Sequence, residues 1–284
     1  MLWVTLFFLL VAILLYVLLG GADFGAGIVE LFTPTHRRRA TENIVYKAIG
    51  PVWEANHMWL VVIIVILFVG FPKAYTDIST YLHWPMLLML LGIVARGTTF
   101  AFRHYDAIED GAQRVHSAIF RWSSFITPLF LGILAGAVTL GHMPSQPPAS
   151  FAQGFLEPWL HPFPLAVGAF FVALSALVAA TFLVGEVSGP EDRRYFAQVA
   201  QRWNLVAIGL GAVVLLLGYQ YAPHVFEGLL ASALSSVLFL VATACVVLVL
   251  YSLRRGRVQL ARVWVGGQVV AILGAWLWHQ FPAL

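Results

Sequence analysis

The chain has 284 residues, of which 61% are hydrophobic and only 10% charged, and its mean hydropathy is +0.86. This composition lies outside the range of soluble globular proteins and predicts a polytopic membrane protein that forms one membrane domain. The single Cys245 excludes an internal disulfide and a cysteine metal cluster, and the formal charge of +3 does not indicate nucleic-acid binding, because the basic residues mark membrane topology instead.

Apolar windows of about 20 residues, long enough to cross roughly 30 Å of hydrocarbon as helices, occur repeatedly along the chain. The sequence therefore predicts an all-α integral membrane protein with eight transmembrane helices. The start, Met1-Leu2-Trp3, lacks the basic segment of a signal peptide, so we expect the first window to be a permanent helix. The windows lie near residues 2–31, 52–71, 81–102, 119–141, 163–186, 203–221, 229–252 and 263–282.

The basic residues alternate between the two sides of the predicted membrane domain. Of the 16 Lys and Arg residues, all but Lys73 and Arg96 fall in the loops after the first, third, fifth and seventh spans or at their edges. Because short cytoplasmic loops carry an excess of Lys and Arg, this distribution predicts that both termini are extracytoplasmic.

The longest outer connection divides the chain into two parts. Residues 142–162 are rich in proline and separate four predicted spans from four. We therefore predict a first four-helix half over 1–141, which carries the acidic motifs, an extracytoplasmic linker over 142–162, and a second four-helix half over 163–284. The expected arrangement is two four-helix bundles.

The first span ends in the small-residue segment Gly-Gly-Ala-Asp-Phe-Gly-Ala-Gly, residues 20–27. Within it Gly21 and Gly25 form a GxxxG step that permits close contact with another helix, and we expect Asp23 to lie at that contact. Glu30 lies one heptad beyond Asp23 on the same face. Glu30 is interpreted either as the mouth of a proton path or as an interfacial residue.

Three ionisable residues are expected at a similar depth in the cytoplasmic half of the membrane. Asp23 is late in span one, Glu54 is early in span two and Arg96 is late in span three. Leaving each unpaired in hydrocarbon costs about 2.5 to 3.5 kcal/mol on the translocon scale, so we expect them to pair. The cluster is either an ion pair that locks the helices together or a proton relay that titrates as one unit.

Residues around Glu54 are candidates for supporting roles. His57 lies one helical turn after Glu54 and either extends the relay or is a core histidine bonded to a backbone group or to water. We expect Asn56 and Trp53 to orient and shield the acid rather than to transfer protons. Spacings typical of metal sites, such as HExxH or CxxC, are absent, so no metal site is predicted.

Four segments in the first 110 residues carry a family resemblance. GGADFGAG at the end of span one, GPVWEANHMWL at the start of span two, FPKAY after it and ARGTTFAFRHY in span three are similar to subunit II of cytochrome bd-type quinol oxidases. The match is specific in this region, whereas the remaining chain agrees mainly in span number and topology.

The resemblance implies a subunit of a complex that oxidises quinol and reduces dioxygen to water, in a prokaryotic cytoplasmic membrane. The chain would not be catalytic alone. A larger subunit I would carry haems b and d, small accessory subunits and lipid are further possible partners, and a structural quinone is known in some members. Asp23, Glu54 and Arg96 match acidic and basic residues of the family motifs, and a proton path is implied there. Two alternatives stay open, a secondary transporter and a purely architectural membrane subunit.

Overall fold

The computed structural model describes residues 2–50, 53–105, 111–144, 148–223, 226–227 and 232–280, without the side chains of 53–55, 103–105, 111–112 and 279–280. Within these residues the secondary structure is helical and contains no strand. In chain order the elements are α1 (Leu2–Leu15), η1 (Tyr16–Gly20), α2 (Gly21–Leu31), α3 (Thr35–Ile49), α4 (Trp53–Gly70), α5 (Pro72–Tyr81), α6 (His83–Tyr105), α7 (Gly111–Leu140), α8 (Phe151–Phe155), α9 (Pro162–Glu186), α10 (Pro190–Tyr221), α12 (Ala233–Arg254) and α13 (Val258–Gln280).

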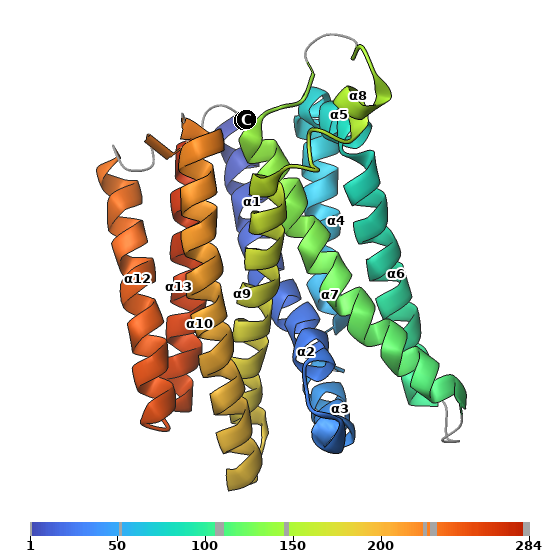
Figure 1. Ribbon diagram of the computed structural model, residues 1–284, viewed down its shortest axis with the longest axis vertical. Coiled ribbons are helices and arrows are strands. Elements are labelled where there is room, and N and C mark those ends of the chain that lie inside the picture. Colours follow the sequence, from blue (N-terminus) through green and yellow to red (C-terminus); the bar gives the residue numbers. More distant parts are fainter. Residues whose placement is uncertain are drawn as a thin grey trace.

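The long helices run side by side in one bundle, and α9 lies among them in contact with several others (Figure 1). In the described part of the chain, seven helices or continuous helix runs are long and apolar enough to cross a membrane. The pair α4 and α5 brings the number to eight if it is counted as one span, because the two helices are bent by 115° at Phe71. Phe71 directly precedes Pro72, and a residue before proline is disfavoured in the helical conformation.

The first predicted span is one helical run with a wider turn inside it. Residues 16–20 form a π-helix, and α1 and α2 continue from its two ends. A π-turn adds about one residue to the turn and is frequently found at functional sites. The helix therefore changes phase between α1 and the acidic motif of α2.

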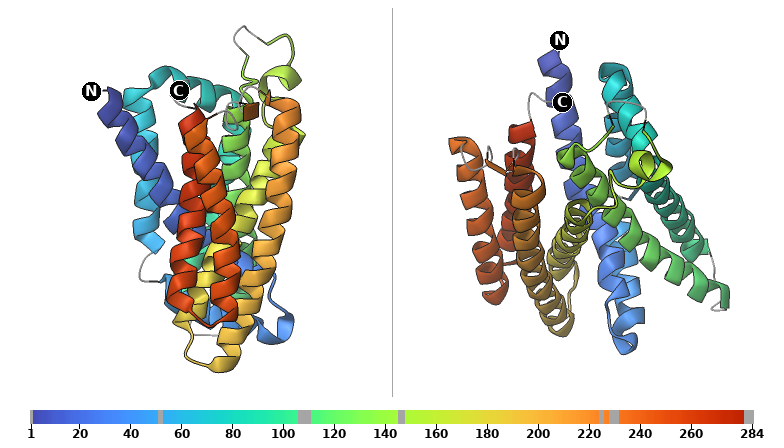
Figure 2. Two further views of the ribbon diagram at one scale, coloured as in Figure 1. Left: turned by 90° about the vertical axis from the view of Figure 1, so that its left-hand side faces the viewer. Right: turned by 45° about the horizontal axis from the view of Figure 1, so that its top comes forward.

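Short helices occupy connections that contain no apolar window. α3 carries the basic residues of the first loop, and α5 and α8 lie together at the opposite end of the bundle (Figure 1). α1 begins and α13 ends at that same end (Figure 2), opposite to α3 and to the connection between α12 and α13. The alternation predicted from the basic residues agrees with this arrangement of the chain.

Close packing at glycine joins α7 to α9. A Cβ atom on Gly132 would lie 2.7 Å from Gly168 Cα, and one on Gly136 would lie 2.7 Å from Pro164 Cα. These helices therefore touch through their backbones, as small residues permit within membranes. α9 also packs against α2, α10 and α13, so it contacts helices of both predicted halves. The division into two separate four-helix bundles stays a prediction.

Candidate functional site

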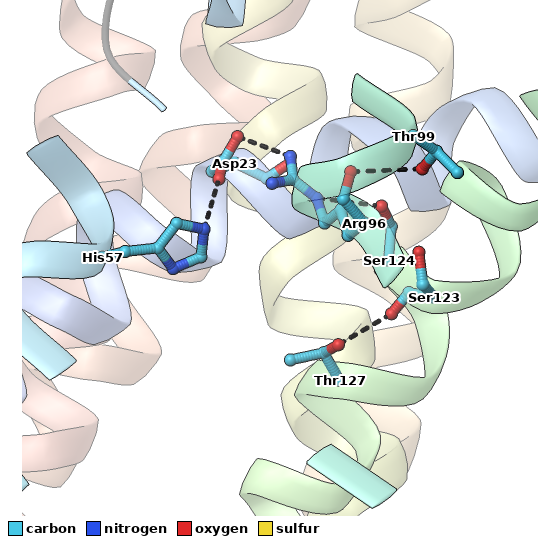
Figure 3. Close-up of polar contacts among 7 residues, drawn as sticks. All are labelled: Asp23, His57, Arg96, Thr99, Ser123, Ser124 and Thr127. Carbon is cyan, nitrogen blue, oxygen red and sulfur yellow. Dashed lines mark hydrogen bonds and ion pairs between the residues drawn. The ribbon is translucent and has the colours of Figure 1, made fainter. Parts of the chain in front are cut away.

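The acidic motif places glycine and aspartate on different faces of α2. A Cβ on Gly25 would lie 2.8 Å from Ala179 Cβ and would overlap the carbonyl of Ser175, so this glycine is pressed against α9. Asp23 is buried and turns instead toward α4 and α6 (Figure 3). Two residues along a helix differ by about 200° in direction, which is why the aspartate does not lie at the glycine contact that we expected for it.

A buried ion pair joins Asp23 to Arg96 of α6. Arg96 Nη2 lies 2.6 Å from Asp23 Oδ1 and also donates to the Asp23 backbone carbonyl at 3.1 Å. The Arg96 side chain has no exposed surface, and the exposed fraction of Asp23 is 2%. A guanidinium at this depth is tolerable only with a partner, since an unpaired charge in hydrocarbon is costly. The expected pairing of these two residues is confirmed.

Helix α7 completes the surroundings of the guanidinium. Arg96 Nε donates a hydrogen bond to Ser124 Oγ at 3.1 Å (Figure 3), and the rings of Phe24 and Phe120 lie 5.1 and 5.0 Å from the guanidinium carbon. A Cβ on Gly27 would overlap the side chain of Ser124, so this glycine lets α7 approach α2 closely. The charge is held by hydrogen bonds on one side and by aromatic faces on the other.

His57 of α4 faces the other carboxylate oxygen. Its Nε2 lies 3.9 Å from Asp23 Oδ2 (Figure 3), which is beyond hydrogen-bond range but close enough for an ion pair when the imidazole is protonated. The ring also meets Phe24 edge to face, with centroids 5.8 Å apart. His57 therefore points at the acid, as an extension of the relay requires.

Buried polar atoms in this region that make no hydrogen bond with the described residues include Tyr16 Oη, Asp23 Oδ2 and Arg96 Nη1. Tyr16 lies in the π-turn and is only 2% exposed. Buried polar atoms without a protein partner generally bind ordered water. The three atoms mark a polar interior at the junction of η1, α2 and α6.

The described residues only partly cover the predicted motif at the start of α4. The helix begins at Trp53, but the side chains of Trp53 and Glu54 lie outside the described residues, so the position of the Glu54 carboxyl group is not defined. Asn56 is buried, with 5% of its surface exposed. The grouping of Glu54 with the ion pair, and the supporting roles of Trp53 and Asn56, stay predictions.

Glu30 forms a second buried ion pair, two turns further along α2. Its side chain is fully buried, and Oε1 lies 3.2 Å from Nη1 of Arg121 on α7. Glu30 is therefore not a solvated interfacial residue. The carboxylate continues the line of polar groups from Asp23 toward the end of the bundle that carries α3.

Sequence reasoning missed Tyr16, Ser124 and Arg121. Ser124 had a detectable signal, because Ser123, Ser124 and Thr127 are polar residues in an otherwise apolar window. Arg121 was assigned to a loop as a topology marker, whereas α7 extends as a helix from Gly111. Tyr16 lies in the π-turn, which has no residue signature in the sequence. No group of three or more His, Cys, Asp or Glu residues that could hold a metal occurs in the described part.

Comparison with known proteins gives consistent matches. A family model described as cytochrome bd terminal oxidase subunit II matches residues 1–284. The chain is 31% identical over 132 residues to the cytochrome bd ubiquinol oxidase subunit 2 of Bacillus subtilis, covering 45% of this chain and 38% of that protein. It is 27% identical over 226 residues to the cytochrome bd-I ubiquinol oxidase subunit 2 of Escherichia coli, covering 75% and 57%.

The chain thus spans about half the length of the curated relatives that it matches. Among solved structures, a chain of the bd oxidase from Geobacillus thermodenitrificans superposes with a TM-score of 0.80 at 18% sequence identity. The superposition covers 98% of this chain and 84% of that chain. It shows that the two share a fold.

Proposed function

This chain belongs to the family of cytochrome bd terminal oxidase subunit II, and on that premise we propose that it is the haem-free subunit of a quinol oxidase that reduces dioxygen to water. The partner is a larger subunit I that holds haems b and d, and the chain alone is not catalytic. The complex lies in a bacterial inner membrane, with the loop after span one on the cytoplasmic side and both termini outside. Binding of a structural quinone or of accessory subunits stays an expectation from the family.

The role that we propose for the Asp23–Arg96 site is proton delivery from the cytoplasmic side. The observation that supports this role is that the two carboxylate oxygens of Asp23 have different surroundings. Oδ1 is held by Arg96 at 2.6 Å, whereas Oδ2 has no hydrogen bond in the described part and faces His57 Nε2 at 3.9 Å. One water molecule or a small side-chain rotation would bridge that gap and let a proton move between imidazole and carboxylate.

The buried Glu30–Arg121 pair and Glu54 extend this path in our proposal. Glu30 lies on the same helix as Asp23, nearer to the end that carries the basic loops. Protons drawn from that side and used in water formation, with electrons supplied by quinol, would charge the membrane without a separate pump.

A second candidate role is architectural, and one observation favours it. Arg96 of α6 bonds to Asp23 of α2 and to Ser124 of α7, so the ion pair ties three helices together. Removing one partner of a buried ion pair costs about 3 to 5 kcal/mol, because the other charge is left uncompensated. A substitution of Asp23 alone could therefore disrupt assembly and hide a proton-transfer role.

The experiment combines single and paired neutral substitutions in the assembled complex. Asp23→Asn is compared with the double variant Asp23→Asn with Arg96→Gln, in which no charge is left unpaired. Haem content reports assembly, and oxygen consumption with saturating quinol reports turnover. If Asp23 delivers protons, the double variant keeps its haems but loses turnover by about tenfold or more.

Glu186→Gln serves as the matched acid-to-amide control, because the Glu186 side chain is 49% exposed and pairs with Arg262 at the end of the bundle. Its turnover should stay unchanged. Recovery of both haem and turnover in the double variant would show that the pair only locks the helices. Glu54→Gln and His57→Gln, measured in the same way, should lower turnover while the haems remain, and normal turnover would remove that residue from the path.

A further inference from the structure

A hollow of about 330 Å³ lies away from Asp23 and Arg96 and is lined by residues of the α9–α10 and α12–α13 connections. It is formed where α9 ends, α10 begins and the connection between α12 and α13 turns. Its wall combines apolar and basic side chains. The lining residues are Val184, Ser188, Pro190, Arg193, Arg194, Ala197, Leu253, Arg254, Gly256 and Val258.

Three arginines give the hollow an uncompensated positive charge. Arg193, Arg194 and Arg254 are exposed, and none forms a salt bridge with a carboxylate in the described part of the chain. Arg193 Nη2 donates to the Val187 carbonyl at 3.2 Å, which fixes that side chain at the wall. Arg37 differs from these three arginines, because it forms salt bridges with Glu191 and Asp192 at the start of α10.

The start of α13 adds to the positive potential. α13 begins at Val258, which lines the hollow, whereas the start of α10 at Pro190 is offset by Glu191 and Asp192 in its first turn. The N-terminal end of a helix carries a partial positive charge and free backbone N–H groups, which favour phosphate and other anions. Gly256 has a φ of +67°, so the turn before α13 has the left-handed conformation that glycine adopts without strain.

We propose that this hollow binds the phosphate ester of an anionic phospholipid headgroup. Arginines present several N–H donors in a planar fork that matches phosphate oxygens. The hollow lies where α12 ends, at Arg254, so it is at the level of the lipid headgroups if α12 spans the membrane. Basic pockets between transmembrane helices on the cytoplasmic side are typical sites for anionic headgroups.

The apolar part of the wall favours a lipid over free phosphate. Val184, Ala197 and Leu253 line the hollow beside the arginines. α10 and α12 are long and apolar enough to cross the membrane and carry exposed large side chains such as Leu205 and Val247, along which acyl chains can pack. A free phosphate ion would use the arginines but would gain nothing from these apolar contacts.

The test uses the purified complex and two variants that remove the same charge from the same end of the molecule. The site variant is Arg194→Gln with Arg254→Gln, and Arg193 is kept because it bonds to the backbone carbonyl of Val187, directly after α9. The control is Arg255→Gln with Arg257→Gln, two exposed arginines of the same turn that do not line the hollow. Binding of short-chain phosphatidylglycerol is measured by native mass spectrometry, with phosphatidylcholine and inorganic phosphate as separate probes.

Because one arginine near an anionic surface contributes roughly fivefold to affinity, the site variant should bind phosphatidylglycerol about 30-fold more weakly, and the control should match the original protein. Arg194→Lys with Arg254→Lys should keep most of the binding and shows that the site survives the substitutions. Equal loss in the site and control variants, or no loss in either, would overturn the proposal. Displacement of the lipid by inorganic phosphate at similar concentration would assign the hollow to free phosphate instead.

Discussion

Replacement of Gly25 by alanine tests whether backbone contact between α2 and α9 positions the acidic site. The added Cβ would overlap the Ser175 carbonyl and lie 2.8 Å from Ala179 Cβ, whereas carbon atoms in contact are normally about 3.5 to 4.0 Å apart. The obstructing atoms belong to the backbone and first side-chain atoms of α9, so they cannot rotate away. α2 must therefore move by about 1 Å or more, and it carries Asp23 with it.

The magnitude follows from two opposing effects. Overpacking of a well-packed contact costs about 1 to 3 kcal/mol, and a rigid obstruction places this case at the upper end. Alanine in place of a helical glycine contributes about 1 kcal/mol in the other direction, so the net destabilisation is about 2 kcal/mol. Gly21→Ala is the matched control, because a Cβ there would lie 3.6 Å from Ser175 Oγ, an ordinary contact. That variant should be neutral or more stable by up to about 1 kcal/mol.

The assay is thermal unfolding of the purified complex, followed by loss of helical circular dichroism and by release of haem. Gly25→Ala should unfold at a clearly lower temperature than Gly21→Ala, with a difference in free energy of about 2 to 3 kcal/mol between the two variants. Its turnover should also fall, because displacement of α2 away from α9 moves Asp23 and disturbs its 2.6 Å contact with Arg96. If the two variants unfold at the same temperature, backbone contact at Gly25 does not position α2.

Two further predictions concern charge outside the central pair. Arg121→Gln removes a charged partner of the fully buried Glu30 and should destabilise the complex in denaturant unfolding by more than Glu186→Gln does. Glu186→Gln changes a half-exposed pair and should cost less than about 1 kcal/mol, and equal losses would contradict the buried pairing. Burial, with a smaller effect of the neighbouring His142 charge, lowers the pKa of His161, just outside α9, below its usual 6.5. As the pH falls, this histidine therefore binds a proton in the unfolded chain at a higher pH than in the folded chain. The stability of the fold should decrease as the pH drops below about 6.5, and His161→Phe should flatten this part of the pH profile of thermal unfolding.

Much of the fold follows from the sequence because hydrocarbon thickness sets span length. The apolar windows near 163–186 and 229–252 lie within a few residues of α9 and α12, since a helix must keep about 20 apolar residues in the membrane. The helical segments that lie outside the apolar windows were less predictable. α10 extends 13 residues before its window, and α3 forms in a polar connection, because amphipathic or charged helices leave no run of apolar residues.

The candidate site was predictable to the extent that buried charge is costly. That cost alone required a partner for Arg96, and Asp23 is that partner. The sequence could not reveal that Ser124 would accept the Arg96 Nε–H, or that Arg121 would reach Glu30, because both contacts join positions more than two dozen residues apart.

The sequence by itself determined that the chain crosses a membrane repeatedly and that oppositely charged groups lie within it, because one-dimensional quantities decide both: the length of apolar runs and the cost of desolvating a charge. Only the tertiary structure decided which face of α2 meets which neighbour. Gly25 packs on α9 and Asp23 turns to α6 because helical phase, altered by the π-turn at residues 16–20, sets the direction of each side chain. Which neighbour a side chain meets depends on where the other helices lie.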